Sequence, residues 1–356
     1  MSATANPRAS RRLRSRRGLI IMSVIAIAVL IGRIIWVNGV FSSAPAGFSG
    51  SCKIAASLPG VEDIATADDL AFVSVASARG PDARDGIYLL AGGKLTKLAG
   101  APKDFHPRGI GLYRSPDGSG IFLMAVNRRS TGRFSVDSFE VTNPKTNPAL
   151  VAQGTIEGGL LTDPQDVAAA GPGAFYVSNN SAKQSSVKWL ASLGILPGSD
   201  ILYFNGMSFQ PVAEDVYGAR GLLLTPDGNH LLAASLTTRS LKSFKREAFG
   251  GKLTEDQSLT LPAAPEKITL DPQGSVWVAG HANLLQWRSF AADPARRAPS
   301  QIFRVNLISG VPQDAAQVYG NDGSEIAAAS VAAALGKRFL IGSSLDDKLL
   351  DCVPTK

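Results

Sequence analysis

Charged and polar residues recur at one place in this sequence, a few positions before a tight turn that joins two apolar runs. They are Glu62 and Asp63, Arg108, Gln165 and Asp166, Arg220, and Glu266 and Lys267. Apolar runs of this kind are typical of buried strands, in which a polar side chain rarely serves packing alone. If the repeats close into a ring, four carboxylates and an amide converge, which is the oxygen-rich chemistry of a calcium site. The alternative is a plug of ion pairs and hydrogen bonds that locks the repeats together.

No motif of a nucleophilic or zinc-dependent hydrolase accompanies these positions. The sequence contains no Gly-x-Ser-x-Gly turn and no histidine–cysteine cluster with the spacing of zinc ligands. Of its three histidines, His106 and His281 lie close to the polar positions in sequence. A lone histidine is more often structural than catalytic, so both interpretations stay open for these two residues.

The turns follow a common pattern in which Pro or Gly separates two apolar runs. The four clearest turns are Ser115–Gly118, Ala170–Gly173, Thr225–Gly228 and Asp271–Gly274, and weaker copies lie at Ala67-Asp68 and Leu335–Lys337. Pro presets φ and Gly accepts a positive φ, so such segments favour hairpins. Six units of about 45–60 residues, each rich in short strands, predict an all-β fold, a six-bladed β-propeller. A β-sandwich is the alternative, but it fits six evenly spaced units poorly.

The N-terminal segment predicts how this domain is attached to a membrane. Residues 1–18 carry six arginines and no acid, and residues 19–41 are predominantly apolar with one charged residue, Arg33. A bilayer core of about 30 Å needs roughly 20 apolar residues in a helix, so we expect a transmembrane anchor over 19–41 with its basic tail in the cytoplasm. The alternative is a signal peptide that is cleaved near Ala44–Ala46.

The rest of the chain has the features of an exported domain. A linker over 42–51 leads to the propeller, 52–356, which we expect on the periplasmic or extracellular side. The only cysteines, Cys52 and Cys352, open and close this domain, and in an oxidising compartment they predict a disulfide clasp rather than two free thiols. The seven arginines of residues 1–40 account for the whole net charge of +7, so nothing favours nucleic-acid binding.

One helical candidate interrupts the strands, in an insertion at about 183–197. Between Ser185 and Leu196, one face gathers Trp189, Leu190, Leu193 and Leu196. This spacing predicts an amphipathic helix. We expect it either to pack on the propeller or to contact lipid. In the second case this helix would be a membrane contact in addition to the N-terminal anchor.

The sequence from about Cys52 to Cys352 resembles the paraoxonase/arylesterase family. The similarity lies in Glu62-Asp63 followed by Leu70-Ala71-Phe72, in Phe105–Ile110, in Asp166-Val167, in Asp271-Pro272 with Trp277-Val278 and Gly280-His281, and in Leu340–Gly342. The resemblance implies a six-bladed propeller that holds two calcium ions in its tunnel and hydrolyses lactones and aryl esters. It also implies a hydrophobic N-terminus that is not cleaved.

The ligands of the two calcium sites of the family are matched to different degrees in this sequence. The structural site of the family is matched by Asp63, the carbonyl of Ile110 and Asp166. The upper, catalytic site falls on Glu62, Gln165, Arg220, Lys267 and Glu266, of which only Glu62 is unchanged. Because Arg220 and Lys267 cannot coordinate a cation, we expect them to replace the upper ion and to pair with the two glutamates. One structural calcium therefore remains the expectation.

The histidine pair of the family falls on Arg108 and Arg128, whereas His281 matches a family histidine near the site. The resemblance thus favours a membrane-anchored hydrolase of carboxylic esters or lactones, with small hydrophobic substrates. The first alternative is a non-catalytic propeller that binds a ligand or a protein at the membrane surface. A further alternative is a basic pocket for anionic small molecules, formed by Arg108, Arg128, Arg220 and Lys267.

Overall fold

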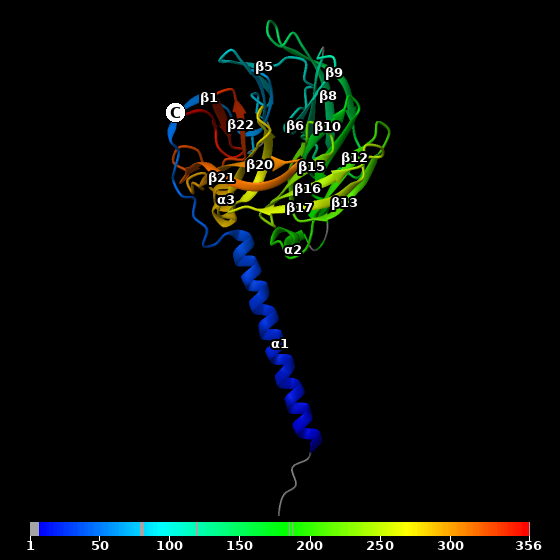
Figure 1. Cartoon of the computed structure of the whole chain (residues 1–356), viewed down its shortest axis with the longest axis vertical. Helices are drawn as coiled ribbons and strands as arrows, with labels where there is room; N and C mark the ends of the chain where they lie inside the picture. The colour runs from blue at the N-terminus through cyan, green and yellow to red at the C-terminus, as the bar shows by residue number, and fades with distance from the viewer. Residues whose placement is uncertain (1–6, 79–81, 119, 185, 187, 356) are drawn as a thin grey trace, which may run out of the picture.

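The computed structural model describes residues 7–78, 82–118, 120–184, 186 and 188–355, and it shows a propeller carried on one long helix (Figure 1). Six four-stranded antiparallel sheets form the blades. The innermost strand of each blade contacts the innermost strand of the next, and the last contacts the first, so the ring is closed. The predicted all-β, six-bladed propeller, preceded by a helix that could span a membrane, is confirmed.

The first five blades follow one another along the chain, and each is a meander that runs outward from the tunnel. Blades 1 and 2 comprise β2 (Val61–Ala67), β3 (Leu70–Val75), β4 (Gly86–Ala91) and β5 (Lys94–Lys97), then β6 (Pro107–Arg114), β7 (Ile121–Arg128), β8 (Phe134–Thr142) and β9 (Ala149–Ile156). Blades 3 and 4 comprise β10 (Pro164–Gly171), β11 (Ala174–Asn179), β12 (Ser199–Phe204) and β13 (Phe209–Val216), then β14 (Ala219–Leu224), β15 (His230–Ser235), β16 (Ser240–Arg246) and β17 (Leu253–Thr260). Blade 5 comprises β18 (Ala264–Leu270), β19 (Val276–His281), β20 (Ser300–Ile308) and β21 (Val311–Asn321).

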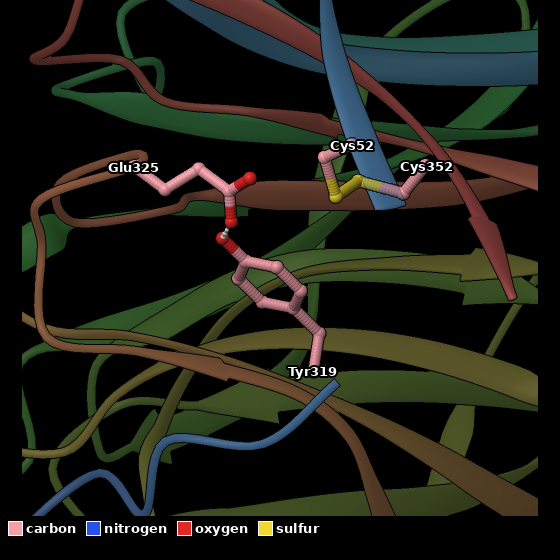
Figure 2. The surroundings of a disulfide bond; sticks show 4 residues. All are labelled: Cys52, Tyr319, Glu325 and Cys352. Carbon is pink, nitrogen blue, oxygen red and sulfur yellow. Dashed lines mark hydrogen bonds between the residues drawn. A yellow bond between two sulfur atoms is a disulfide. The ribbon is translucent and has the colours of Figure 1, made fainter. Parts of the chain in front are cut away.

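The sixth blade joins the two ends of the domain. It comprises β22 (Val331–Leu335), β23 (Arg338–Gly342), β24 (Lys348–Pro354) and the N-terminal strand β1 (Gly50–Ser57). Cys52 of β1 lies opposite Cys352 of β24, and a disulfide joins them across 300 residues of sequence. Figure 2 shows this bond together with Tyr319, whose hydroxyl donates a hydrogen bond to Oε2 of Glu325 at 2.7 Å. The predicted disulfide clasp is confirmed.

The turns after the inner strands have the geometry that the sequence predicts. The N–H of Gly228 donates to the carbonyl of Thr225 at 2.8 Å, and that of Gly274 donates to Asp271 at 3.0 Å. Both glycines have a positive φ, +69° and +83°, which residues with a Cβ rarely adopt. Between blades the core is apolar, as where Phe72 of blade 1 packs with Phe105 and Phe139 of blade 2.

The long helix α1 (Pro7–Asn38) ends against the propeller rather than at a distance from it. Its segment Gly18–Asn38 is long and apolar enough to cross a membrane, a property that a signal sequence shares. The helix ends three residues before the predicted limit of the anchor, because Gly39 has a φ of +59° and makes a turn. Val37 and Asn38 are buried, and Nε of Arg33 donates to the carbonyl of Gly194 at 2.7 Å.

The insertion of blade 3 lies on the same face of the propeller (Figure 1). It consists of a 3₁₀ turn, Ser181–Gln184, and the short helix α2 (Lys188–Ser192). The predicted helix over Ser185–Leu196 is thus realised as one regular turn, and Ser185 and Val187 lie outside the described residues. Gly194, with a φ of +68°, ends α2 as a left-handed C-terminal residue. Trp189 and Leu196 remain exposed, whereas Leu190 and Leu193 are half-buried.

A second helix on this face, α3 (Leu284–Ala292), follows β19 and contacts the end of α1. Its first turn is capped by Asn283, whose side chain accepts from the N–H groups of Leu285 and Gln286. Leu284 packs with Val37 of α1 in a small buried cluster. The helices α1, α2 and α3 therefore gather at one end of the tunnel.

Candidate functional site at the tunnel mouth

The tunnel mouth lies where the inner strands begin, and five of these strands share an irregular pairing there. The register shifts within β2, β6, β10, β14 and β18, each time at the polar residues noted in the sequence. A β-bulge redirects a side chain out of the alternating pattern of its strand. The bulges therefore explain why polar residues interrupt apolar strands and how their side chains reach the centre of the ring.

Two buried aspartates connect neighbouring blades just inside the mouth. Oδ2 of Asp63 accepts from the N–H of Ile110 at 2.8 Å, and Oδ2 of Asp166 accepts from the N–H of Leu222 at 2.9 Å. Each Oδ1 accepts the N–H of the next residue in the chain, at 2.9 Å. Burial raises the pKa of Asp63 well above its usual range, and the nearby Asp166 raises it further. Two buried carboxyl groups that interact in this way favour a cation beside them.

Lys267 supplies that cation. Its Nζ lies 3.3 Å from Oδ1 of Asp166 and donates to the carbonyl of Gln165 at 2.6 Å, and its side chain is 4% exposed. Burial also raises the pKa of Asp166, although Lys267 acts against this shift. A Cβ on Gly109 would collide with Oδ1 of Asp166 and would lie 2.6 Å from Nζ of Lys267, so only glycine fits beside the pair.

The charge of Lys267 bears directly on the structural calcium that the resemblance implies at Asp63, Ile110 and Asp166. Calcium prefers about six to eight oxygen ligands. All four carboxylate oxygens of Asp63 and Asp166 already accept backbone N–H groups, and the ammonium group of Lys267 lies beside Asp166, where a cation would bind. Among the described residues, no three His, Cys, Asp or Glu side chains are arranged to hold a metal. With Lys267 charged, these residues do not fit a calcium ion.

A second layer of charge surrounds Arg220. Its NH1 donates to Oε1 of Gln165 at 2.6 Å and lies 3.7 Å from Oε1 of Glu266. Burial by itself would raise the pKa of Glu266, but Arg220, His281 and Lys267 lower it to about 2. The pairing of Arg220 with a glutamate agrees with the expectation from the sequence, whereas Lys267 pairs with Asp166 instead.

His281 is buried beside this layer. Its Nε2 lies 3.7 Å from Oε2 of Glu266, and its ring stacks on Trp287 with 5.3 Å between centroids. Neither ring nitrogen has a hydrogen-bond partner within the described part of the chain. His281 therefore lies at ion-pair distance from Glu266 and packs against Trp287.

Glu62 differs from the other carboxylates of the mouth. Within the described residues its carboxylate has no hydrogen bond and no ion pair at 4 Å or less, and its side chain is only partly buried. Burial raises the pKa of Glu62, against the opposing effects of Arg108, Lys267 and Arg220. It is therefore the mouth carboxylate that is free to exchange a proton with a bound molecule.

Of the remaining predicted residues, Arg108 and His106 contact carboxylates outside this layer of charge, and Arg128 is exposed. NH1 of Arg108 is 2.9 Å from Oδ1 of Asp163 and 3.0 Å from the carbonyl of Pro164, so it joins blade 2 to blade 3. Arg128 is exposed at the end of β7. His106 is held at Nδ1 by Asp85, at 2.7 Å. Of the four cations of the predicted basic pocket, Arg220 lines the cavity described next, whereas Arg108, Arg128 and Lys267 are not among its lining residues.

A cavity of about 460 Å³ opens beside Arg220 and Gln165. Residues of α2 and α3 line it as well, among them Trp189, Trp287 and Arg288. Trp287 and Arg288 were not predicted as site residues, because the helix α3 that carries them was not predicted. The signal that could have found this helix is Asn283, a typical N-cap residue ahead of an apolar stretch.

Comparison with known proteins agrees with the fold and with the family resemblance of the sequence. The Arylesterase family matches residues 95–352. Serum paraoxonase/arylesterase 2 of Gallus gallus is 27% identical over 241 residues, which is 67% of this chain and 66% of the relative. Serum paraoxonase/arylesterase 1 of Homo sapiens is 27% identical over 242 residues, again 67% of this chain and 66% of the relative. The matched part thus spans about two thirds of the curated relatives.

Among solved structures, a luciferin-regenerating enzyme superposes with a TM-score of 0.53 at 10% identity, covering 85% of this chain and 95% of that one. A likeness at this identity supports the propeller fold alone. The family match covers most of the chain, and it agrees with the family resemblance noted in the sequence. This chain is a member of the paraoxonase/arylesterase family.

Proposed function

We propose that the chain hydrolyses carboxylic esters or lactones at the tunnel mouth, where the charge of Arg220, a residue that lines the cavity, acts on Glu62. The observation that carries this proposal is Glu62, a partly buried carboxylate with a raised pKa and no ion-pair partner within the described residues, set among Arg108, Arg220 and Lys267. A base whose pKa is raised toward neutral pH, next to fixed positive charge, is typical of hydrolytic sites. Family membership supports the same reaction class.

The reaction can be written with the side chains of this chain. Glu62 accepts a proton from a water molecule, whose oxygen attacks the carbonyl carbon of the ester. The guanidinium group of Arg220, which lines the cavity, donates to the oxyanion that forms. The tetrahedral intermediate then collapses, the bond to the leaving oxygen breaks, and the proton returns from Glu62 to that oxygen. The products are a carboxylic acid and an alcohol, or one hydroxy acid from a lactone.

Calcium has no step in this scheme, because the Lys267 ammonium group supplies the positive charge beside Asp166. Arg220 and Lys267 together then provide the fixed electrostatic field that stabilises a developing oxyanion. The scheme therefore predicts that the rate is the same with added calcium and with a chelator.

A non-catalytic propeller is the second candidate function, and the Arg220–Glu266 pair favours it. NH1 of Arg220 lies 3.7 Å from Oε1 of Glu266, so one cation and one carboxylate of the mouth neutralise each other. A purely structural plug of ion pairs has the same arrangement. Turnover on a panel of lactones and aryl esters decides between the two, measured with the full chain in neutral detergent. Hydrolysis that disappears in Glu62→Gln but persists in Glu247→Gln, an exposed control, supports the hydrolase. No turnover on any ester, with or without calcium, supports the binding propeller.

We further propose that α1 is retained as a membrane anchor and is not removed as a signal sequence. Val37 is fully buried with Leu236, Ala264 and Leu284 of the propeller, so cleavage after residue 46 would uncover this cluster. The basic tail favours a cytoplasmic N-terminus, which leaves the propeller outside. Mass spectrometry of the protein from a membrane fraction tests this, with an intact N-terminal peptide expected and a mature start after Ala46 as the contrary result.

A further inference from the structure

The charges that line the mouth cavity are all of one sign. Its described lining residues include Lys188, Arg220 and Arg288, and no aspartate or glutamate is among them. Trp189 and Trp287 supply aromatic surface in the same cavity. A cavity that combines cations with apolar rings favours a ligand that carries both a negative charge and a hydrocarbon part.

Arg288 is the cation of this set whose charge is left without a counter-charge. Its NH1 lies 2.5 Å from Oδ1 of Asn38, and its NH2 donates to the carbonyl of Ser192 at 3.0 Å. Both partners are neutral, and no carboxylate of the described chain lies within ion-pair distance of its guanidinium group. Burial lowers the pKa of Arg288. A half-buried charge held only by neutral groups is destabilising until an anion joins it.

The contacts of Arg288 also connect the cavity to the end of α1. Asn38 is the last residue of α1, and Ser192 is the last residue of α2. Trp189, which lines the cavity, is 58% exposed, and Leu196 just after α2 is 38% exposed. If α1 spans a bilayer, these apolar side chains lie at its surface, where an amphiphile would meet the cavity from the lipid side.

We propose that the cavity binds the anionic head of an amphiphile, a carboxylate or a phosphate on an apolar chain, with Arg288 as its counter-charge and the two tryptophans against the chain. This inference rests on the proposed function, for which it names the substrate class: esters or lactones that carry a separate anionic group. Arg220 remains the group that faces the ester carbonyl, and Arg288 positions the molecule through its anion. Lys188 adds positive charge at the exposed side of the cavity.

Binding of matched probes tests the proposal without any need for turnover. The full chain in phosphatidylcholine nanodiscs is titrated with decanoate and with decanol, and quenching of tryptophan fluorescence is followed. Decanoate is expected to bind at least tenfold more tightly than decanol, and Arg288→Gln is expected to abolish this preference. Arg296→Gln is the matched control, because Arg296 lies in the loop just after α3, is 71% exposed and pairs with Asp293, and neither residue lines the cavity.

Equal affinity for decanoate and decanol overturns the proposal, as does a preference that survives Arg288→Gln. If Arg288→Gln fails to fold, the two probes on the unaltered chain still decide. Phosphatidylglycerol in the nanodisc separates the sources of the anion: weaker decanoate binding there identifies a membrane lipid as the occupant, and unchanged binding identifies a free amphiphile. Anion binding without hydrolysis contradicts only the proposed reaction, and hydrolysis without anion preference contradicts only this inference.

Discussion

Nζ of Lys267 lies 3.3 Å from Oδ1 of Asp166, inside a propeller whose family resemblance implies calcium at that aspartate. The ammonium group is buried, and the two aspartates near it have raised pKa values because they are buried. A side chain thus provides the charge that a bound ion would otherwise provide. The stability and the chemistry of the mouth follow from this substitution.

Removing the charge of Lys267 should destabilise the fold strongly. Lys267→Met leaves Asp63 and Asp166 buried without a cation, and breaking a buried pair of this kind costs about 3–5 kcal/mol. Lys337→Met, at an exposed turn, should change stability by less than about 0.5 kcal/mol. Denaturant unfolding of the full chain in detergent measures both. Equal stability of the two variants would show that Lys267 does not compensate the aspartates.

The low pKa of Glu266 predicts a loss of stability in acid. The carboxyl has a pKa of about 2 in the folded chain, against an ordinary value of 4.5. Because the folded pKa is the lower one, the contribution is complete above pH 4.5 and is lost as the pH falls toward 2. It amounts to on the order of 3 kcal/mol. Glu266→Gln should flatten this part of the pH profile, while the exposed control Glu247→Gln should leave it unchanged.

Glu62 should matter for catalysis and little for stability. A general base contributes about 10²–10⁴-fold to the rate, so Glu62→Gln should lower kcat by that factor. The melting temperature should stay within a few degrees of the unaltered chain, because within the described residues Glu62 makes no ion pair. The rate should rise with pH about a midpoint above 4.5, since burial raises the pKa of Glu62. A full rate in Glu62→Gln would exclude Glu62 as the base.

The turn pattern predicted the ring and its six blades, and the two cysteines predicted the disulfide, because hairpin turns are local features and cysteines can be counted. The bulges in the inner strands are matters of register, which a single sequence does not reveal. The partner of Lys267 was missed for a related reason, since a long flexible side chain can reach either layer of the mouth. The helix α2 stopped short because Gly194 ends it, and α3 escaped notice because nine residues carry little periodicity.

The docking of α1 on the propeller predicts a difference between two valines of the same helix. Val37 is fully buried against Leu236 and Leu284, whereas Val24 is 60% exposed on the segment that could span the membrane. Val37→Ala should lower the unfolding free energy of the propeller by about 1–3 kcal/mol, by loss of packed methyl groups. Val24→Ala should leave it unchanged. Differential scanning calorimetry in detergent compares them, and equal melting temperatures would mean that the helix end is not docked.

The disulfide should stabilise the closed ring by limiting the unfolded chain. It joins residues 300 apart in sequence, and the chain-entropy model gives about 6 kcal/mol for a loop of that length. The double variant Cys52→Ser with Cys352→Ser should therefore unfold at clearly lower denaturant concentration. Addition of a reductant to the unaltered chain should reproduce this shift, and a shift absent in both cases would contradict the clasp.

Elemental analysis of calcium tests the central claim most directly. The full chain is purified in neutral detergent, dialysed exhaustively against calcium-free buffer, and measured beside Lys267→Asn, which replaces the ammonium group with an amide oxygen donor. If Lys267 takes the place of the ion, the unaltered chain should contain no stoichiometric calcium, and Lys267→Asn should gain calcium-dependent thermal stability. One or two calcium ions retained by the unaltered chain would contradict the account.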